Sequence, residues 1–175
     1  DFITQQRPEE MIVSACGSTY WGALTVASVM QELTGITTRA VTSGDLLLYP
    51  ETILSDARRT VLLAPSRSGK TSETLGAVEL FRKKAKGAVL SICSDGEAPI
   101  AQASDLVLEL PWAMEQSICQ TRSYTAITLA GLFLAANWSN NHALLEELMA
   151  LPRAGEVFLA RYREQLIELG HSSWW

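Results

Sequence analysis

Cysteine and histidine are scarce in this chain of 175 residues, which has three cysteines and two histidines. Cys16, Cys93 and Cys119 lie far apart, and none belongs to a C-x-x-C pair. The sequence therefore lacks the spacing of a zinc site or a disulfide framework, and we expect no metal centre. Free cysteines are typical of a reducing compartment, so we expect a cytoplasmic protein.

Long apolar runs and an excess of basic residues are also absent. The richest apolar stretch, residues 126–138, is shorter than the roughly 20 residues of a membrane span. No charged and then apolar leader is present, so we expect neither membrane insertion nor export. The first residue is Asp1 rather than Met, so we expect a trimmed chain or a piece of a longer one.

The net charge of −5 argues against a nucleic-acid partner, which requires clustered basic residues. The densest basic cluster comprises Arg82, Lys83, Lys84 and Lys86. It falls at the end of a predicted helix, where cations offset the helix dipole. We interpret it as a solvated helix end.

Short β-rich runs alternate with longer helical stretches. Strands are predicted over residues 11–15, 37–42, 60–64, 88–92 and 106–108, and helices over 20–33, 72–86, 100–103, 122–137 and 141–169, the last broken near Pro152. The run TVLLA at 60–64 has no polar alternation, as in a strand buried on both faces. The pattern predicts an α/β fold, a three-layer α-β-α arrangement with a five-stranded parallel sheet of flavodoxin-like order 2-1-3-4-5.

This pattern predicts one domain over residues 1–150, followed by a helical tail over 151–175. Ligands of such sheets bind beyond the carboxyl ends of the strands. Polar segments follow the first, third and fifth predicted strands, and we expect the functional site there.

The segment after the third strand, Ser66 to Thr71 (SRSGKT), combines hydroxyls, a glycine and two cations at a strand-to-helix turn. Unpaired backbone N–H groups and the positive end of a helix suit a phosphate dianion. A simple capping box with Glu73 is the alternative interpretation. After the first strand, Gly17 permits close approach of a ligand, but this segment alone is a weak signal, and a plain helix N-cap at Ser18 or Thr19 is the favoured interpretation of it.

The same turn nearly matches a nucleotide-binding P-loop over residues 64–71. Ala64 replaces the first glycine, and Pro65 removes a backbone donor from the cradle. The turn also follows the third strand rather than the first, and no strand ends in an aspartate suited to magnesium. We therefore favour a phosphate site of another kind over a nucleotide site.

After the fifth strand, a polar segment from Pro111 to Thr125 leads into an apolar helix. Its one carboxylate, Glu115, is either a candidate catalytic group or an ion-paired surface residue.

Together the three segments resemble the sugar isomerase (SIS) domain. That family has S-x-S-G-x-T after strand three and E-x-x-V-x-x-T-[KR]-x-[FY]-T after strand five, and Ala15 to Tyr20 is similar to its first loop. The resemblance covers roughly residues 10 to 138. It departs from the family pattern at Lys70, where glutamate is common, and at Gln120, where a small residue is frequent.

The resemblance implies roles for individual residues. The phosphate of the ligand would be held by Ser66, Arg67, Ser68, Gly69 and Thr71. The sugar would be lined by Cys16, Gly17 and Ser18 and closed in by Ile118, Gln120 and Thr121. Glu115 is the carboxylate that these loops offer to catalysis.

The function that the resemblance implies is one half of a phosphosugar isomerase or of an amino-sugar-phosphate deaminase or deglycase. The ligand would be a hexose or amino-hexose 6-phosphate, with no cofactor and no metal. Such enzymes usually carry two SIS domains, with the catalytic glutamate, lysine and histidine mainly in the second. We expect homo-oligomerisation or pairing with a second SIS domain. The alternative is a non-catalytic domain that senses sugar phosphates.

Overall fold

The computed structural model describes residues 5–54, 59–85 and 87–172. Its elements are β1 (Glu10–Ala15), α2 (Ser18–Thr34), β2 (Thr37–Thr42), α3 (Ser43–Leu48), α4 (Pro50–Ile53), β3 (Thr60–Pro65), α5 (Ser72–Lys84), β4 (Val89–Cys93), α6 (Pro99–Gln102), β5 (Leu106–Glu109), the 3₁₀ turn η1 (Pro111–Ala113), α7 (Arg122–Trp138) and α8 (His142–His171). The five strands form one sheet in the order β2-β1-β3-β4-β5, and all neighbouring strands are parallel. The predicted fold class and strand order are confirmed.

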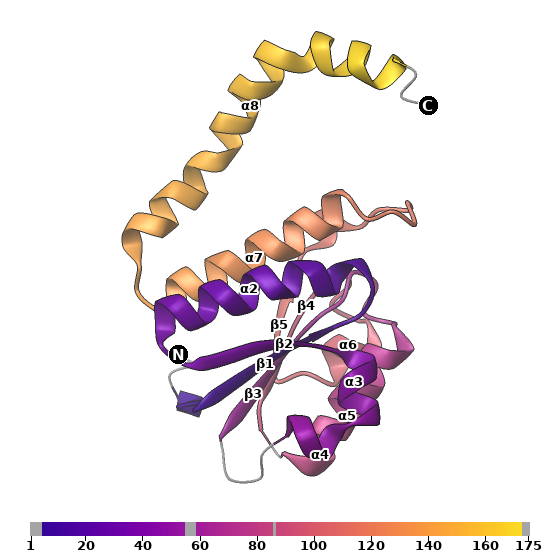
Figure 1. Ribbon diagram of the computed structural model, residues 1–175, viewed down its shortest axis with the longest axis vertical. Helices are drawn as coiled ribbons and strands as arrows, with labels where there is room; N and C mark the ends of the chain where they lie inside the picture. Colours follow the sequence, from indigo (N-terminus) through magenta and orange to yellow (C-terminus); the bar gives the residue numbers. More distant parts are fainter. Residues whose placement is uncertain (1–4, 55–58, 86, 173–175) are drawn as a thin grey trace.

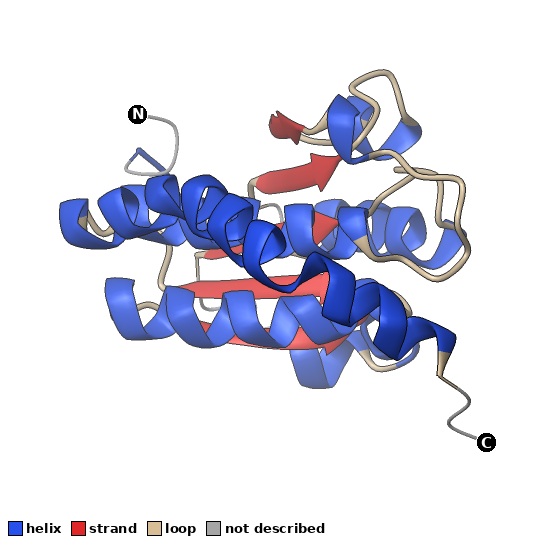
Figure 2. Ribbon diagram, turned by 90° about the horizontal axis from the view of Figure 1, so that it is seen from above, coloured by secondary structure: helices blue, strands red, loops and turns tan. Residues whose placement is uncertain are grey.

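Helices cover both faces of the sheet (Figures 1 and 2). Alternate residues of each central strand face opposite layers, as the period of a strand requires. Met11 and Val13 of β1 join the core beneath α2 and α7, whereas Ile12 joins the core beneath α3, α5 and α6. Every residue of β1, β3 and β4 is buried, which explains why these strands show no polar alternation in the sequence.

A glycine on each helix allows α2 and α7 to pack closely. A Cβ atom added to Gly131 would lie 2.4 Å from Cγ2 of Val26, and one added to Gly22 would lie 2.5 Å from Oγ1 of Thr128. Real Cβ atoms do not approach other atoms so closely, so both positions require glycine or a shift of the helices. This packing fixes α7, and with it the segment that enters α7 from β5.

The structure corrects two expectations about the helices. The break near Pro152 is wrong, because α8 continues through Pro152 from His142 to His171. Proline removes one backbone hydrogen bond, and the helix formers that flank it allow the helix to curve and continue. The sequence patterns also missed α3 and α4, which are short; the side chain of Thr42 caps α3 by accepting a hydrogen bond from Asp45 N at 3.0 Å.

The basic cluster at the end of α5 is partly neutralised by acidic side chains. Arg82 Nη1 lies 2.8 Å from Asp105 Oδ2, and Lys84 Nζ lies 2.5 Å from Glu51 Oε1. The fourth member of the cluster, Lys86, falls outside the described residues. Among the described helices, none combines the length and the apolar composition needed to cross a membrane.

The long helix α8 extends away from the domain (Figure 1). Leu148, near its start, is buried, but large apolar side chains farther along α8 are exposed. Leu151, Phe158, Leu166 and Leu169 recur at multiples of roughly one helical turn, and they are called the α8 stripe below.

Candidate phosphate site

The carboxyl ends of the parallel strands lie at one edge of the sheet, and the helices that follow them begin there. The N-caps of α2, α5 and α7 are Gly17, Thr71 and Thr121. The N-termini of α2 and α5 carry unpaired N–H groups and a partial positive charge, whereas the first N–H groups of α7 donate to the carboxylate of Glu115. The edge is therefore suited to an anion.

A small polar cavity of about 60 Å³ lies at this edge, and it is called the polar cavity below. It is lined by Cys16, Thr19, Pro65, Ser66, Arg67, Ser68, Thr71, Thr74 and Gln120. Segments after β1, β3 and β5 thus meet in one hollow, although more than 100 residues separate Cys16 from Gln120 along the chain. None of its lining residues is a carboxylate, so its electrostatics favour an anion.

The sequence predictions agree with this cavity in part. It brings together six of the predicted residues, which are Cys16, Ser66, Arg67, Ser68, Thr71 and Gln120. Five others, Gly17, Ser18, Gly69, Ile118 and Thr121, do not line it. Ser18 is an exposed first residue of α2, and Ile118 is 93% exposed.

The backbone of the turn after β3 has the form of an anion cradle. Gly69 has φ +63°, and a Cβ atom there would lie 2.5 Å from Cβ of Ala98, so both conformation and space require glycine. Among the described residues, no protein acceptor pairs with the N–H groups of Ser68 and Gly69. Ser68 lines the polar cavity, so its N–H is a candidate donor to a ligand there, whereas Gly69 is buried.

The hydroxyls of this turn are not consumed in helix capping. Thr71 is the N-cap of α5, but its side chain makes no capping hydrogen bond. Its Oγ1 instead lies 3.4 Å from Oγ of Ser66. The carboxylate of Glu73 accepts a hydrogen bond from the hydroxyl of Ser72. The capping-box alternative is therefore wrong, and so is the N-cap interpretation of Ser18 or Thr19, because Gly17 is the N-cap of α2.

Three lining residues, Thr19, Pro65 and Thr74, were not among the predicted site residues. The hydroxyl of Thr19 donates to Oε1 of Gln120 at 3.4 Å. Oγ1 of Thr74 accepts from Ser43 Oγ at 3.3 Å, and Ser43 Oγ lies 3.2 Å from Oγ of Ser14. This chain of buried hydroxyls backs the polar cavity. Thr74 could have been found from the sequence, because its hydroxyl lies one turn of helix after the serine-rich turn.

The carboxylate of Glu115 is hydrogen-bonded to the first residues of α7. Its carboxylate accepts hydrogen bonds from the backbone N–H and the hydroxyl of Thr121 at 3.0 and 3.1 Å, and from those of Ser123 at 2.9 and 2.5 Å. The hydroxyl and backbone N–H of Ser123, followed by those of Thr121, lower the pKa of Glu115 to about 2. The side chain is thus an ionised cap of α7, and a carboxylate of such low pKa is a weak general base.

The two cations of the turn have different partners. Lys70 Nζ lies 3.7 Å from Asp95 Oδ2, and Lys70 does not line the polar cavity. Arg67 lines the cavity, and its Nη1 donates to the carbonyl of Ser117 at 2.5 Å. In the described part of the chain, no group of three or more His, Cys, Asp or Glu residues is arranged to hold a metal ion.

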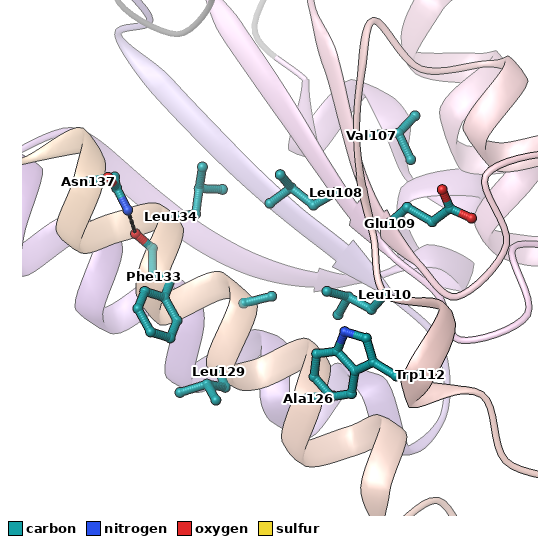
Figure 3. Close-up of a pocket in the computed structure, with 11 residues that line it drawn as sticks. Val107, Leu108, Glu109, Leu110, Trp112, Ala126, Leu129, Phe133, Leu134 and Asn137 are labelled. Carbon is teal, nitrogen blue, oxygen red and sulfur yellow. Dashed lines mark hydrogen bonds between the residues drawn. The ribbon is translucent and has the colours of Figure 1, made fainter. Parts of the chain in front are cut away.

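A second hollow, of about 510 Å³, lies between β5, η1 and α7 and is called the apolar groove below. Figure 3 shows Leu108, Leu110 and Trp112 facing Leu129 and Phe133 of α7. Its lining is mostly hydrocarbon, with few groups able to pair with an anion. The groove is therefore unsuited to recognise a phosphate.

Comparisons with known proteins identify the family of this domain. The profile of the SIS domain family matches residues 3–137. The glutamine–fructose-6-phosphate aminotransferase (isomerizing) of Chlamydia trachomatis is 26% identical over 160 residues, which are 86% of this chain and 26% of that protein.

Solved structures show the same fold. The glucosamine-6-phosphate deaminase of Thermotoga maritima superposes with a TM-score of 0.72 at 27% identity, over 87% of this chain and 47% of that chain. The C-terminal domain of glucosamine-fructose-6-phosphate aminotransferase from Francisella tularensis gives 0.76 at 16% identity, over 95% and 49%. This chain spans about half the length of these solved chains and about a quarter of the curated relative. Because the family profile covers most of the chain and the fold agrees, this chain belongs to the SIS domain family.

Proposed function

We propose that this chain binds the phosphate group of a phosphorylated ketose or amino sugar, such as a hexose or amino-hexose 6-phosphate. The observation that carries the proposal is the polar cavity, where the hydroxyls of Ser66, Ser68 and Thr71 and the cation of Arg67 gather at the start of α5. Charge-assisted hydrogen bonds from such donors are the usual means of holding a phosphate dianion. The aminotransferase of Chlamydia trachomatis and the deaminase of Thermotoga maritima are both named for sugar 6-phosphates, which supports the same ligand class.

The sugar would extend from the polar cavity toward the loops after β1 and β5. Cys16 and Gln120 line the cavity on those two sides. Gly17 has φ +59°, and a Cβ atom placed there would meet nothing within 4 Å, which leaves room for a ligand beside the backbone. We assign Gly17, Ser18, Ile118 and Thr121 to the sugar rather than to the phosphate.

We infer that the chain is one half of an isomerase or deaminase. Moving a proton between C1 and C2 of a sugar requires a base within hydrogen-bond reach. Glu115 is committed to the N-terminus of α7, with its pKa lowered to about 2 by those hydrogen bonds. The base would therefore come from outside these 175 residues, consistent with solved relatives about twice as long.

The commitment of Glu115 to the start of α7 also favours a second candidate, a non-catalytic domain that senses sugar phosphates. Both candidates share the polar cavity and differ in what a complete protein would join to it. A second SIS domain would favour the enzyme, and a DNA-binding domain would favour the sensor.

We also infer self-association, or pairing with a second SIS domain. The α8 stripe and the apolar groove expose hydrocarbon on one molecule, with Phe158 50% and Trp112 61% exposed. Exposed apolar surfaces of this kind mark protein interfaces.

Thermal denaturation with two ligands tests the proposed site. A ligand that binds only the folded state raises its stability, so millimolar fructose 6-phosphate or glucosamine 6-phosphate should raise the melting temperature. Magnesium-ATP should not, because Pro65 lies within β3 and supplies no backbone donor. A shift with ATP alone would replace the proposal with a nucleotide site.

A further inference from the structure

The guanidinium of Arg67 joins two parts of the site. It lines the polar cavity, and its Nη1 donates to the carbonyl of Ser117, in the loop between η1 and α7, at 2.5 Å. No ion pair among the described residues includes Arg67. A cation without a carboxylate partner therefore lies between a proposed anion site and a loop.

The two ends of this connection differ in how firmly they are held. On the turn side, the carbonyl of Arg67 accepts from Ser94 N at 3.1 Å, the N–H of Ser66 donates to Ile92 O at 2.9 Å, and the carbonyl of Gly69 accepts from Ile100 N at 3.1 Å. The turn is thus fixed to β4 and α6. It forms a rigid base for the Arg67 side chain.

On the loop side, residues 116–119 are exposed. The hydroxyl of Ser117 donates to the carbonyl of Cys119 at 2.8 Å, within the loop itself. Among the described residues, only the guanidinium of Arg67 forms a hydrogen bond to residues 116–119 from outside the loop. The position of this exposed segment therefore depends on where the Arg67 side chain lies.

An arginine side chain has five N–H donors in a planar fork. One donor of Arg67 is engaged with Ser117, so the remaining donors can pair with a phosphate without releasing the loop. We propose that Arg67 is a positioning residue that transmits occupancy of the phosphate cavity to the loop of residues 116–119. This inference rests on the proposed phosphate site. It adds a way in which phosphate binding controls the loop that we propose to close over the sugar.

Phosphate in the polar cavity would fix the Arg67 rotamer by a second, charge-assisted contact and so would restrict Ser117 and its neighbours. By reciprocity, closing the loop on a sugar strengthens phosphate binding by the same factor. Binding of the phosphate thus orders the loop before the sugar is enclosed. A sugar without phosphate would leave the loop open.

Amide hydrogen exchange of the whole chain, with inorganic phosphate as the probe, tests this assignment. At saturating phosphate we expect slower exchange in two segments of the natural sequence, the turn (66–71) and the loop (116–119). The loop effect should be about fivefold or more, the lower end of common coupling factors. In Arg67→Lys the turn should remain protected, because an ammonium still attracts phosphate, whereas loop protection should be lost, because a point charge cannot hold two acceptors in a fork.

Arg122→Lys is the matched control. The guanidinium of Arg122 donates to the carbonyl of Met114, at the start of the same loop, but Arg122 does not line the polar cavity. Phosphate should therefore protect residues 116–119 in this variant as in the natural chain. Phosphate-dependent loop protection that persists in Arg67→Lys would overturn the role of Arg67 while leaving the phosphate site intact. Phosphate that protects neither segment of the natural chain would overturn both proposals.

Discussion

The polar cavity and the apolar groove lie on the same domain and differ in almost every property. The cavity is about 60 Å³ and lined by hydroxyls and a cation, whereas the groove is about 510 Å³ and lined mainly by hydrocarbon. The larger hollow offers area for packing, and the smaller one offers converging donors. Size therefore indicates where another surface can pack, and donor geometry indicates where an anion can bind.

The largest effect expected from this contrast concerns catalysis. The polar cavity provides binding donors, while its nearby carboxylate, Glu115, is tied to Thr121 and Ser123. The 175-residue chain should therefore bind sugar phosphate but isomerise or deaminate it roughly 10²–10⁴-fold more slowly than a protein that supplies the base. A coupled assay on both proteins measures this ratio. Full activity of this chain alone would show that a base is present within it, and Glu115→Gln would then be the first variant to test.

The cavity hydroxyls should control ligand affinity. Ser66→Ala or Ser68→Ala removes a charge-assisted hydrogen bond to the phosphate and should weaken binding by about 1.5–3 kcal/mol. Calorimetric titration with a hexose 6-phosphate measures the change. Ser28→Ala is the control, because the Ser28 hydroxyl donates to Leu24 O on the exposed side of α2. Equal affinity in all three variants would place the phosphate elsewhere.

Stability should respond to the packing of α7 and much less to changes in α8. Gly131→Ala adds a Cβ atom 2.4 Å from Val26 Cγ2 and should destabilise the fold by about 1–3 kcal/mol. Gly155→Ala adds a Cβ atom with nothing within 4 Å, in exposed α8, and should stabilise it by about 0.5–1 kcal/mol through helix propensity. Urea denaturation of both variants gives the two free energies of unfolding. Similar values for the two would mean that α2 and α7 can separate without cost.

The smallest effect on binding, and the clearest on association, should come from the apolar surfaces. Phe133→Ser in the groove or Leu166→Ser in the α8 stripe should shift the chain toward a monomer in light scattering. Neither residue lines the polar cavity, so affinity for sugar phosphate should stay within about twofold, the usual range for distant sites. If the natural chain is strictly monomeric at high concentration, the apolar groove and the α8 stripe do not mediate self-association.

Buried strands and loop composition were readable from the sequence. The run from Thr60 to Ala64 has no polar alternation because β3 is buried on both faces. The serine-rich turn from Ser66 to Thr71 could be placed at the carboxyl edge, because every parallel strand ends there. These inferences depend on the hydrophobic period and on the topology of the strands. Both can be inferred from short stretches of sequence.

Membership of the polar cavity was not readable in the same way. Thr74 lines it although it lies beyond the marked turn of residues 66–71, and Ile118 does not line it although it lies in the marked segment of residues 111–125. The difference depends on how α5 and the loop before α7 are oriented by packing across the domain. Short elements such as α3, with six residues, were missed for a related reason, since fewer than two turns of helix leave too few residues for a period to appear.

The sequence by itself determined the layered α/β fold, the strand order and the kind of chemistry at the sheet edge, because hydrophobic period and polar turns are local properties. Tertiary structure decided which hydroxyls meet in one cavity, that Glu115 is held as a cap, and that Arg67 reaches Ser117. Those contacts join residues up to about 100 positions apart, and only the close packing of α2, α5 and α7 around the sheet sets their distances.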